Sequence, residues 1–467
     1  MRLPFRETLD KLPPPWGGDL VPAVRESFAG ARSTLIVMDD DPTGCQTVHG
    51  IPILTAWPVE ALRAEFGRSP VFFILTNSRS LPVREAINLD REVARNIVTA
   101  ASPTGRRFMV ISRSDSTLRG HFRVEIETLS AELGLSDAVT LCIPAFFEGG
   151  RFTIGDVHYV REGDELVPAA ETPYAKDPSF GFASSNLKAY IEEKTGGAVA
   201  RGDVCSISLE DIRGGGPEKV AENLEGCAGG SFCVVNACER SDMDVVALAV
   251  LRAMENGKRF LFRTAAAIIP ALIGLEPRAL LGAGDFPPPQ SGCGLVVVGS
   301  FVPMSSRQLA HLLKHGDVGG VEFDVRRLLA GGGKVEIDRV AAEANRFVAA
   351  RRDTVVYTSR ELVTGATAEE SIRIQAGVAD ALVEIVRGMQ AAPRYVLAKG
   401  GITSHDIAAR ALGVKRAVVA GQIIPGVPVW RLGEGSRFPG MGYIVFPGNV
   451  GGETSMTDVV RTLRARP

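Results

Sequence analysis

Short apolar runs that alternate with amphipathic segments are the feature that most constrains the fold of this chain. In the first half, the runs are rich in β-branched residues and read STLIVMDD, VFFILTNS, RFMVISRS, AVTLCIPAF, DVCSISLEDI and SFCVVNACE. Continuous apolar runs bounded by polar residues are typical of strands buried on both faces of a sheet. Segments with apolar residues at helical spacing, such as LPVREAINLDREVARNIVTAA, separate several of these runs. This alternation predicts a parallel sheet that is covered by helices.

The stretch LLGAGDFPPPQSGCG, residues 280–294, interrupts the alternation and predicts a domain boundary. Beyond it, runs such as GLVVVGS, TVVYTS and YVLAKGG again precede helical patterns. A length of 467 residues also exceeds what one simple core usually supports. We therefore expect the α/β class, with two α/β domains that each contain a largely parallel, helix-covered sheet and that face a cleft. The expected boundaries are 1–32 for an N-terminal arm, 33–283 for the first domain and 294–467 for the second.

Charge, hydropathy and cysteine spacing disfavour several classes of function. A formal net charge of −2 provides no basic field for nucleic acid, and no apolar stretch approaches the ~20 residues of a membrane span. The first residues lack the apolar core of a signal peptide. The seven cysteines match no common zinc-ligand spacing, so we expect reduced, mostly buried thiols in a cytoplasmic protein. The expected partners are small molecules, and a homodimer is one alternative for the oligomeric state.

Acidic, basic and hydroxyl side chains follow the strands of the first half. DDDPTG, TNSRS, SRSDSTLRG and PAFFEGG stand after four of the predicted strands. Because ligands of parallel sheets bind beyond the carboxyl ends of the strands, these loops should share one rim. Polar loops after strands are common, but three consecutive buried aspartates are unfavourable unless an arginine, a cation or a ligand compensates them. The rim suits a small, polyhydroxylated anion, with arginines for a carboxylate and aspartates as hydroxyl acceptors, general base or cation ligands.

Glycine-rich loops follow the strands of the second half. In LAKGGITSHDIA, a strand runs into Gly400 and Gly401, and a helix starts directly afterwards. Glycines let backbone N–H groups approach a phosphate, and a helix N-terminus adds donors, although Ser404 as an ordinary N-cap is the alternative. Together with VVGSFVPMSSRQ and FPGNVGGET, this loop predicts a nucleotide cradle. The chain has neither a Walker A loop nor a dinucleotide fingerprint after its first strand.

Two further features lie near these loops. GAGDF, residues 282–286, resembles the anion hole of ribokinase-like sugar kinases, in which Asp285 would be the base. Three prolines follow it instead of a helix, so a linker is the favoured interpretation. Among the histidines, His121 lies next to the Ser-Asp-Ser-Thr run of the predicted rim.

Several uncommon strings, taken in order, resemble the four-carbon acid sugar kinase family. They are DDDPTG, SRSDSTLRGHF, PAFFEGGRFTIGDVHYV, TPYAKDPSFGF, GITS, PGVPVW and PGNVGGE, and they cover most of the chain from about residue 33 onward. Members of this family phosphorylate threonate, erythronate or 3-oxo-tetronate with ATP. The resemblance implies an N-terminal domain that binds the sugar acid and a C-terminal domain that binds the nucleotide, with ATP and Mg²⁺ as cofactors.

The resemblance, together with the residue chemistry of the rim and the glycine loops, indicates which residues act. The catalytic candidates are Asp40 and Asp41. The substrate-binding candidates are Asp39, Arg79, Ser112, Arg113, Ser114, Asp115, Ser116 and Arg119. The nucleotide-binding candidates are Ser300, Lys399, Gly400, Gly401, Ile402, Thr403 and Gly448. Ile402 stands where many relatives carry a glutamate, and Lys399 adds a positive charge, so metal ligands and substrate identity stay open.

The resulting hypothesis is ATP-dependent phosphoryl transfer to a hydroxyl of a four-carbon sugar acid. Arginines hold the substrate carboxylate, and Asp40 or Asp41 orients and deprotonates the attacking hydroxyl. Two alternatives remain. One is a ribokinase-like or other small-sugar kinase, and the other is a non-catalytic protein that binds sugar acids.

Overall fold

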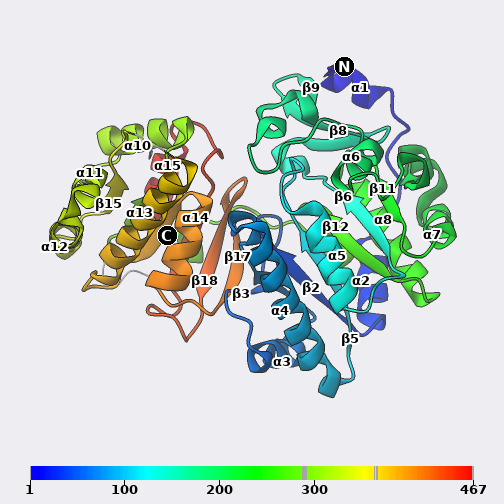
Figure 1. Cartoon of the computed structure of the whole chain (residues 1–467), viewed down its shortest axis with the longest axis horizontal. Coiled ribbons are helices and arrows are strands. Elements are labelled where there is room, and N and C mark those ends of the chain that lie inside the picture. The colour runs from blue at the N-terminus through cyan, green and yellow to red at the C-terminus, as the bar shows by residue number, and fades with distance from the viewer. Residues whose placement is uncertain (1, 287–291, 362, 364–366, 465–467) are drawn as a thin grey trace. The chain divides into compact units, whose positions relative to one another are not determined.

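The computed structural model describes residues 2–286, 292–361, 363 and 367–464, and it divides into two compact units. Each unit combines a sheet with flanking helices, so the predicted two-domain α/β class is confirmed (Figure 1). The units comprise Met1–Val48 with Ala56–Pro277, and His49–Thr55 with Arg278–Pro467. The short segment 49–55 thus belongs to the second unit, whereas the boundaries expected from the sequence assigned it to the first domain.

The main sheet of the first unit is parallel, with the order β10-β11-β6-β12-β5-β2-β4. Its strands are β2 (Ser33–Asp39), β4 (Val71–Leu75), β5 (Arg107–Arg113), β6 (Val139–Ile143), β10 (Cys205–Ile207), β11 (Phe232–Val235) and β12 (Phe260–Thr264). All residues of β2 are buried, as its continuous apolar run predicts. In the register, Asp39 pairs with Leu75 and Arg113, and Arg113 pairs with Thr264. Four strands therefore end at the same rim.

Helices cover both faces of this sheet, because each helix has its apolar residues along one of its own faces and packs that face on the strands. The group α3 (Val59–Arg68), α4 (Val83–Ala101) and α5 (Phe122–Glu132) packs together, and so does the group α2 (Val21–Gly30), α8 (Arg240–Glu255) and α9 (Ile268–Leu272). Figure 1 shows the first group in front of the strands. Helices α6 (Leu187–Lys194) and α7 (Gly216–Gly226) complete the unit. The buried face of α4 consists of Ala86, Asp90, Val93, Ala94, Ile97, Ala100 and Ala101. One aspartate thus lies on an otherwise apolar helix face.

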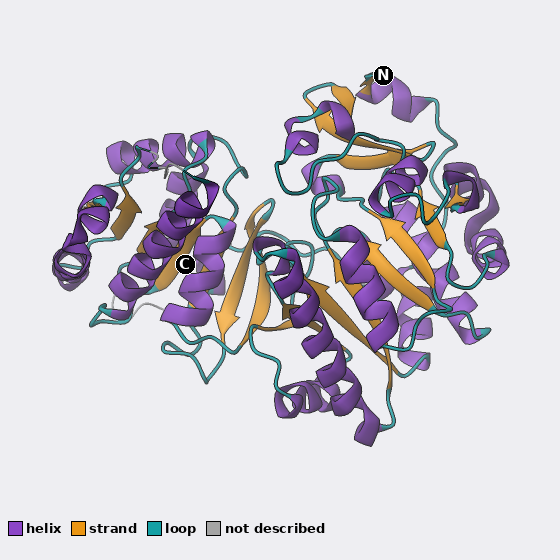
Figure 2. Ribbon diagram, viewed as in Figure 1, coloured by secondary structure: helices purple, strands orange, loops and turns teal. Residues whose placement is uncertain are grey.

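A small antiparallel sheet and the N-terminal arm belong to the same unit (Figure 2). The sheet has the order β1 (Leu3–Pro4), β9 (Glu165–Pro168), β8 (Val157–Glu162) and β7 (Arg151–Ile154). The arm continues as α1 (Phe5–Asp10), whose Phe5 and Leu9 pack on Phe152 and Leu166. The predicted arm is therefore tied to the domain by a strand pairing and an apolar cluster.

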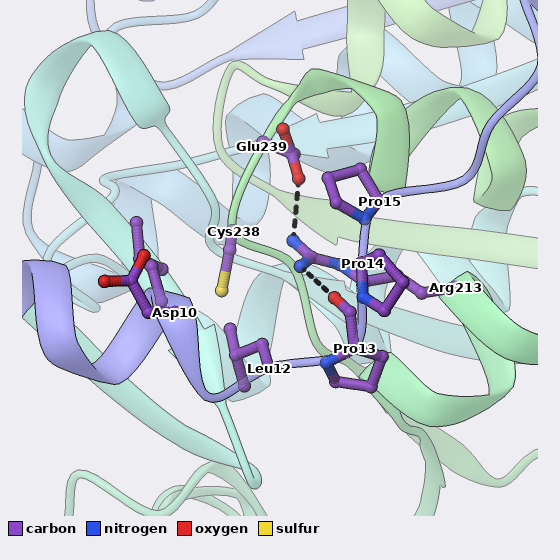
Figure 3. A pocket seen from close by; sticks show the side chains of 9 residues that line it. Asp10, Leu12, Pro13, Pro14, Pro15, Arg213, Cys238 and Glu239 are labelled. Atoms are coloured by element: carbon purple, nitrogen blue, oxygen red, sulfur yellow. Dashed lines mark hydrogen bonds and ion pairs between the residues drawn. The ribbon is translucent and has the colours of Figure 1, made fainter.

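Arg213 fastens the next stretch of the arm, beside a cavity of about 490 Å³ (Figure 3). Its guanidinium donates to both carboxylate oxygens of Asp242, to Glu239 and to the carbonyl of Pro13. Since this buried cation is paired with carboxylates and also donates to the arm's backbone, its role is to hold the arm against the domain.

The second unit has a mixed sheet with the order β3-β17-β18-β19-β16-β13-β15-β14. Its strands are β3 (Pro52–Leu54), β13 (Leu295–Val298), β14 (Gly319–Phe323), β15 (Thr354–Thr358), β16 (Tyr395–Lys399), β17 (Arg416–Ile424), β18 (Val427–Leu432) and β19 (Gly442–Phe446). Strands β19, β16, β13, β15 and β14 are parallel, whereas β3, β17 and β18 pair antiparallel. The parallel strands end at one rim, which is where their loops gather.

The helices of the second unit follow the parallel strands. They are α10 (Pro303–His315), α11 (Val325–Arg327), α12 (Gly333–Ala349), α13 (Ala368–Arg387), α14 (Gly401–Asp406) and α15 (Ser455–Arg464). Helices α10 and α15 pack together, and so do α12 and α13. Within the part of the chain that the structure describes, no helix combines the length and apolar character needed to cross a bilayer.

The predicted linker lies at the start of the second unit. Residues 287–291, which hold its prolines, lie outside the described residues. Leu281 and Phe286 belong to the apolar core of the second unit. Asp285 accepts hydrogen bonds from Arg278 (2.7 Å) and from the backbone N–H of Gly282 (2.9 Å), so its carboxylate closes a local turn.

Candidate functional site

The acidic turn after β2 is held by the backbone and side chains that surround it. Asp39 ends β2, and a Cβ at Gly44 would overlap both of its carboxylate oxygens. Only glycine therefore lets the DDDPTG turn fold back onto this strand end. Thr43 donates from its backbone N–H (2.8 Å) and its hydroxyl to Asp41 Oδ1. Gly44 and Thr43 thus fix the directions of Asp39 and Asp41.

Two arginines pair with these aspartates from neighbouring strand ends. Arg113 Nη1 donates to Asp39 Oδ1 at 3.2 Å and lies 3.8 Å from Asp40 Oδ1. Arg79, after β4, donates to Asp41 Oδ2, and its Nη1 lies 3.8 Å from Asp40 Oδ1. Asp40 is therefore flanked by two guanidinium groups, which compensate the charges that made the triple aspartate unfavourable.

Asp40 keeps one carboxylate oxygen without a hydrogen bond from the described residues. The hydroxyl of Ser114 donates to its Oδ2 at 3.1 Å, whereas Oδ1 accepts no hydrogen bond from the described residues although Asp40 is only 3% exposed. Asp39 Oδ2 is also unpartnered, but Asp39 is fully buried against Gly44. Both oxygens of Asp41 are occupied, by Thr43 and Arg79. Asp40 is thus the aspartate with acceptor capacity left for a ligand.

The pKa values separate Asp41 from the other two aspartates. Burial raises the pKa of Asp39 to about 7 and that of Asp40 to about 6, although nearby arginines oppose the shift. Burial also raises the pKa of Asp41, but Arg79 and the donors of Thr43 outweigh it, so the net shift is downward. Asp40 therefore titrates near neutrality, as a general base should, while Asp41 stays ionised.

A second layer of charged residues behind the rim was missed by the sequence analysis. Arg263, near the end of β12, donates to Ser112 Oγ at 2.8 Å and to Glu125 on α5. Glu125 also accepts from Ser78 at 2.9 Å. Burial, with Glu125 and Asp40 nearby, raises the pKa of Asp90 on α4 to about 8. An arginine within the apolar run FLFRT was the available signal, because a buried charge in a strand needs partners.

The outer part of the rim is more accessible. Asp115 accepts from Arg119 Nε at 2.7 Å and lies 3.5 Å from Arg79 Nη1. Arg119 is 30% exposed, lies over the ring of Tyr174 at 5.1 Å, and its Nη1 is 3.7 Å from Asp177. The loop TPYAKDPSFGF thus contacts the rim, as an ordered functional loop does.

The structure gives the remaining first-half candidates smaller roles. Ser112 accepts a hydrogen bond from Arg263, and the carbonyl of Ser116 contacts the buried ring of His158 at 2.8 Å. His121 is held by the carbonyl of Leu81 at 3.0 Å. Ser114, Asp115, Arg119 and Arg263 line a small cavity beside Tyr190. The polar rim therefore combines an inner, buried layer with an outer, more accessible one.

The glycine loops of the second unit gather at the ends of β13, β16 and β19. Gly400 has a φ of +111°, and a Cβ there would lie 3.0 Å from Ser300 Cβ. A Cβ at Gly448 would lie 3.1 Å from the Ser300 hydroxyl, which accepts from Ser305 at 2.9 Å. Three loops far apart in sequence therefore approach one another so closely that a side chain is excluded at Gly400 and Gly448.

The other second-half candidates differ in accessibility. Gly401 begins α14, Thr403 lies against Gly299, and Ile402 is 56% exposed. Lys399 is fully buried, donates to the carbonyl of Pro447 at 2.6 Å and lies 4.0 Å from the ring centre of Phe446. Burial lowers the pKa of Lys399 to about 7. Lys399 thus ties two loops together beneath the rim.

Arg360 was missed by the sequence analysis. It follows β15 and donates to the carbonyl of Ser300 and, at 2.9 Å, to the hydroxyl of Ser306. Its Nε is buried without a hydrogen-bond partner in the described part of the chain. The sequence signal was TSRE after an apolar run, which is the same pattern that marked Arg79 in the first half. A guanidinium beside glycine loops is suited to phosphate.

The carboxylates do not form an evident cation site. Among the described residues, no group of three or more His, Cys, Asp or Glu side chains is arranged to hold a metal ion. The aspartates of the rim are instead directed at arginines. Glycine loops after parallel strands are of the kind that accommodates phosphate groups, whereas the described side chains do not by themselves form a dedicated Mg²⁺ cage.

Comparison with known proteins defines the class of protein. A sugar-binding N-terminal domain model matches residues 35–272, and a nucleotide-binding C-terminal domain model matches residues 295–456. These matches coincide with the aspartate–arginine rim and with the glycine loops. The chain is thus built from a sugar-binding and a nucleotide-binding domain.

Relatives with curated names narrow this class to one family. A D-threonate kinase of Salmonella typhimurium is 27% identical over 70% of this chain and 72% of its own length. In Cupriavidus necator, a D-threonate kinase and a 3-oxo-tetronate kinase are each 25% identical, over 85% and 88% of this chain and 90% of their own lengths. The chain belongs to the four-carbon acid sugar kinase family.

Solved structures share the fold. A Haemophilus influenzae protein from a family of unknown function superposes with a TM-score of 0.61 at 19% identity, over 92% of this chain and all of its own. A Salmonella typhimurium protein described as a putative tRNA synthase gives a TM-score of 0.66 at 17% identity, over 92% of this chain and 98% of its own. At these identities the likeness concerns the fold alone.

Proposed function

We propose that this protein is an ATP-dependent kinase that phosphorylates a hydroxyl of a four-carbon sugar acid of the threonate, erythronate or 3-oxo-tetronate type. The observation that carries the proposal is Asp40 Oδ1, a buried acceptor without a hydrogen bond from the described residues, between the guanidinium groups of Arg79 and Arg113. The named relatives are kinases of such acids, and the family unites a sugar-binding with a nucleotide-binding domain.

The arginines divide into two groups by accessibility. Arg113 and Arg263 are buried and paired with carboxylates, so they stabilise the rim itself. Arg79 and Arg119 are 17% and 30% exposed, and they bind the carboxylate of the sugar acid. The carboxylate of the substrate thereby balances positive charge at the outer layer, while its hydroxyls face the aspartates.

Asp40 acts as the general base in this proposal. With a pKa near 6 it is ionised at neutral pH, and Ser114 fixes the orientation of its carboxylate. Asp40 Oδ1 then orients the acceptor hydroxyl and receives its proton. Asp41, with both oxygens occupied, holds Arg79 in place and is a positioning residue.

The second unit binds the nucleotide through backbone amides of the loops around Gly400 and Gly448, with Arg360 as a charged contact to phosphate. ATP, when bound, supplies the γ-phosphoryl group. Phosphoryl transfer is catalysed mainly by positioning and by charge stabilisation, so these amides and Arg360 hold the phosphates and offset their charge. Mg²⁺ accompanies ATP in the proposal, but no residue is assigned to it.

A coupled assay for ADP release, with purified full-length protein and threonate, erythronate and 3-oxo-tetronate of both hands, tests the proposal. We expect ADP release with at least one acid, and Asp40→Asn should abolish it while thermal stabilisation by the same acid persists. Stabilisation by an acid without any ADP release would instead establish a non-catalytic binding protein. Asp285→Ala is the control for the ribokinase-like alternative, because Asp285 is tied to Arg278 and its loss should be silent. A homodimer and a cytoplasmic location stay predictions.

A further inference from the structure

The buried face of helix α10 has a polar and an apolar half. Its buried residues are Ser305, Gln308, Leu309 and Leu312, which recur at the spacing of one helix face. Leu309 and Leu312 belong to the apolar core of the second unit, where α10 packs on α15 (Figure 1). Ser305 and Gln308 are fully buried as well, although both are polar. Because buried polar side chains need hydrogen-bond partners, the contacts of these two residues indicate their role.

Both side chains donate to the glycine loop that follows β19. The hydroxyl of Ser305 donates to the carbonyl of Gly448 at 3.1 Å. The side-chain nitrogen of Gln308 donates to two further carbonyls, that of Val450 at 3.0 Å and that of Gly452 at 2.8 Å, so both of its hydrogens are used. Three carbonyls at alternate positions of one loop are therefore held by one helix.

The N–H groups of the same loop are left for a ligand. A fourth carbonyl, that of Pro447, accepts from the ammonium group of Lys399 at 2.6 Å. The N–H groups of residues 448–451, in contrast, donate no hydrogen bond to any described residue. Among these residues, Asn449 and Gly451 are exposed. The loop is thus polarised, since its carbonyl oxygens are bound by the protein while consecutive N–H groups stay available, an arrangement that suits an anion.

Gln308 holds this position although one of its own atoms is left without a partner. Its Oε1 is buried and accepts no hydrogen bond from the described residues. An unsatisfied buried acceptor is destabilising, so an apolar side chain of similar length would serve better if α10 only packed against its neighbours. The need to direct the carbonyls of Val450 and Gly452 accounts for a glutamine here, because its amide offers two donors from one nitrogen.

Helix α10 also contacts the cation that the proposed function assigns to phosphate. Ser306 accepts a hydrogen bond from Arg360 at 2.9 Å, and the same guanidinium donates to the carbonyl of Ser300. Adjacent residues of one helix therefore touch both the polarised loop and Arg360. The buried polar half of α10 lies where it orders the groups that would surround a phosphate.

We propose that Gln308, supported by Ser305, is a positioning residue that makes the loop 447–453 select the phosphates of the nucleotide. The inference rests on the proposed nucleotide site and adds the side chains that set the polarity of its loop. Gln308 keeps the negative ends of two peptide dipoles away from the phosphates. Without its two donors, the carbonyls of Val450 and Gly452 turn toward water, and the rotated peptide groups present oxygen where N–H groups stood. Gln308 is fully buried, so it acts through the loop.

Gln308→Met tests this role, because it keeps the length of the side chain and removes both donors. We expect calorimetric titration of the full-length variant with ADP, and with inorganic tripolyphosphate as a phosphate-only probe, to give Kd values roughly 10-fold or more above wild type. The KM for ATP should rise likewise, while the KM for the sugar acid and thermal stabilisation by that acid stay unchanged. Ser305→Ala should raise the same Kd values by a smaller factor.

His311→Leu is the matched control. His311 lies about one turn further along α10, and its ring contacts the hydroxyl of Thr457 on α15 at 2.8 Å. Its replacement therefore removes a contact between two helices and none with the loop, so the Kd for tripolyphosphate should not change. Equal losses in His311→Leu and Gln308→Met, or a Gln308→Met variant that binds tripolyphosphate as tightly as wild type, would overturn the proposal.

Hydrogen exchange of the wild type, together with Ser305→Ala, decides the question even where Gln308→Met fails to fold. The N–H groups of residues 448–451 should exchange rapidly in the free protein and become protected when tripolyphosphate or ADP is added, as mass spectrometry of peptides from this loop will detect. Protection without ADP release from any acid supports this inference and contradicts the proposed kinase activity. ADP release without protection of the loop refutes the inference and leaves the kinase activity standing, and failure to bind both probes refutes the inference as well.

Discussion

The buried carboxyl group of Asp90 leads to a specific prediction about how the free energy of unfolding depends on pH. Asp90 lies on the apolar face of α4, its Oδ2 is buried without a hydrogen-bond partner in the described chain, and burial raises its pKa to about 8 from 3.8. At neutral pH this side chain is therefore mostly a neutral acid in the folded protein, but it is ionised in the unfolded chain. Asp90→Asn replaces that neutral acid with a neutral amide of the same shape.

The sign follows from linkage between protonation and folding. A folded-state pKa above the unfolded value means that the stability present below pH 3.8 is lost as the pH rises toward 8. At 1.36 kcal/mol per pKa unit, this loss reaches about 5 kcal/mol at pH 7.5 as an upper bound. Recovery of only about 2 kcal/mol by Asp90→Asn would raise the Tm of the first unit by roughly 4–8 °C.

Calorimetry or urea unfolding of the full chain between pH 5 and pH 8.5 is the assay. The advantage of Asp90→Asn over wild type should grow with pH up to about 8 and level off above it. Glu85→Gln, which removes an exposed carboxylate from the same helix, gives the baseline. A variant that is destabilised by the same amount at pH 5 and pH 8.5 would refute the reasoning, since a pH-independent cost would come from altered packing alone.

Further predictions concern the reaction. The kcat/KM for the sugar acid should fall as the pH drops below about 6, because burial raises the pKa of Asp40 to that value and only the ionised form accepts a proton; a profile that is flat from pH 5 to pH 8 would contradict this. Arg119→Lys should raise KM for the acid by roughly 10-fold or more with kcat little changed, because a bidentate contact worth about 1.5–3 kcal/mol is weakened. Steady-state kinetics measures both constants. Gly400→Ala should weaken ATP binding in calorimetric titration while leaving stabilisation by the sugar acid intact, because a φ of +111° and the contact with Ser300 exclude a side chain.

The fold was largely readable from the sequence because each element carries a local signal. Continuous apolar runs became buried parallel strands, as in β2 and β13, and the amphipathic segment 83–101 became α4. The segment 49–55 was not readable in this way. The pairing of β3 with β17 depends on residues far away in the chain, and a three-residue strand has no periodicity to detect.

The candidate site was readable only at the rim. Asp39 and Arg113 end neighbouring strands and Arg79 lies in the loop after the next strand, so the topology of a parallel sheet brings them together. Asp90 and Glu125 lie on helices and reach the site through packing of α4 and α5, which no spacing rule predicts. The sequence also could not distinguish Asp40 from Asp41, since that difference arises from the donors of Thr43 and Arg79.

The early position of β3 in the chain has a consequence for synthesis on the ribosome. Leu54 pairs with Arg416, which emerges roughly 360 positions later, so at 5–20 residues per second this strand waits roughly 20–70 s for its partner. By then the first unit has been translated completely, while segment 49–55, which carries β3, still lacks its partner strand. Expression of residues 278–467 alone would lack this strand and leave the outer edge of β17 bare, which makes self-association the expected fate of that fragment.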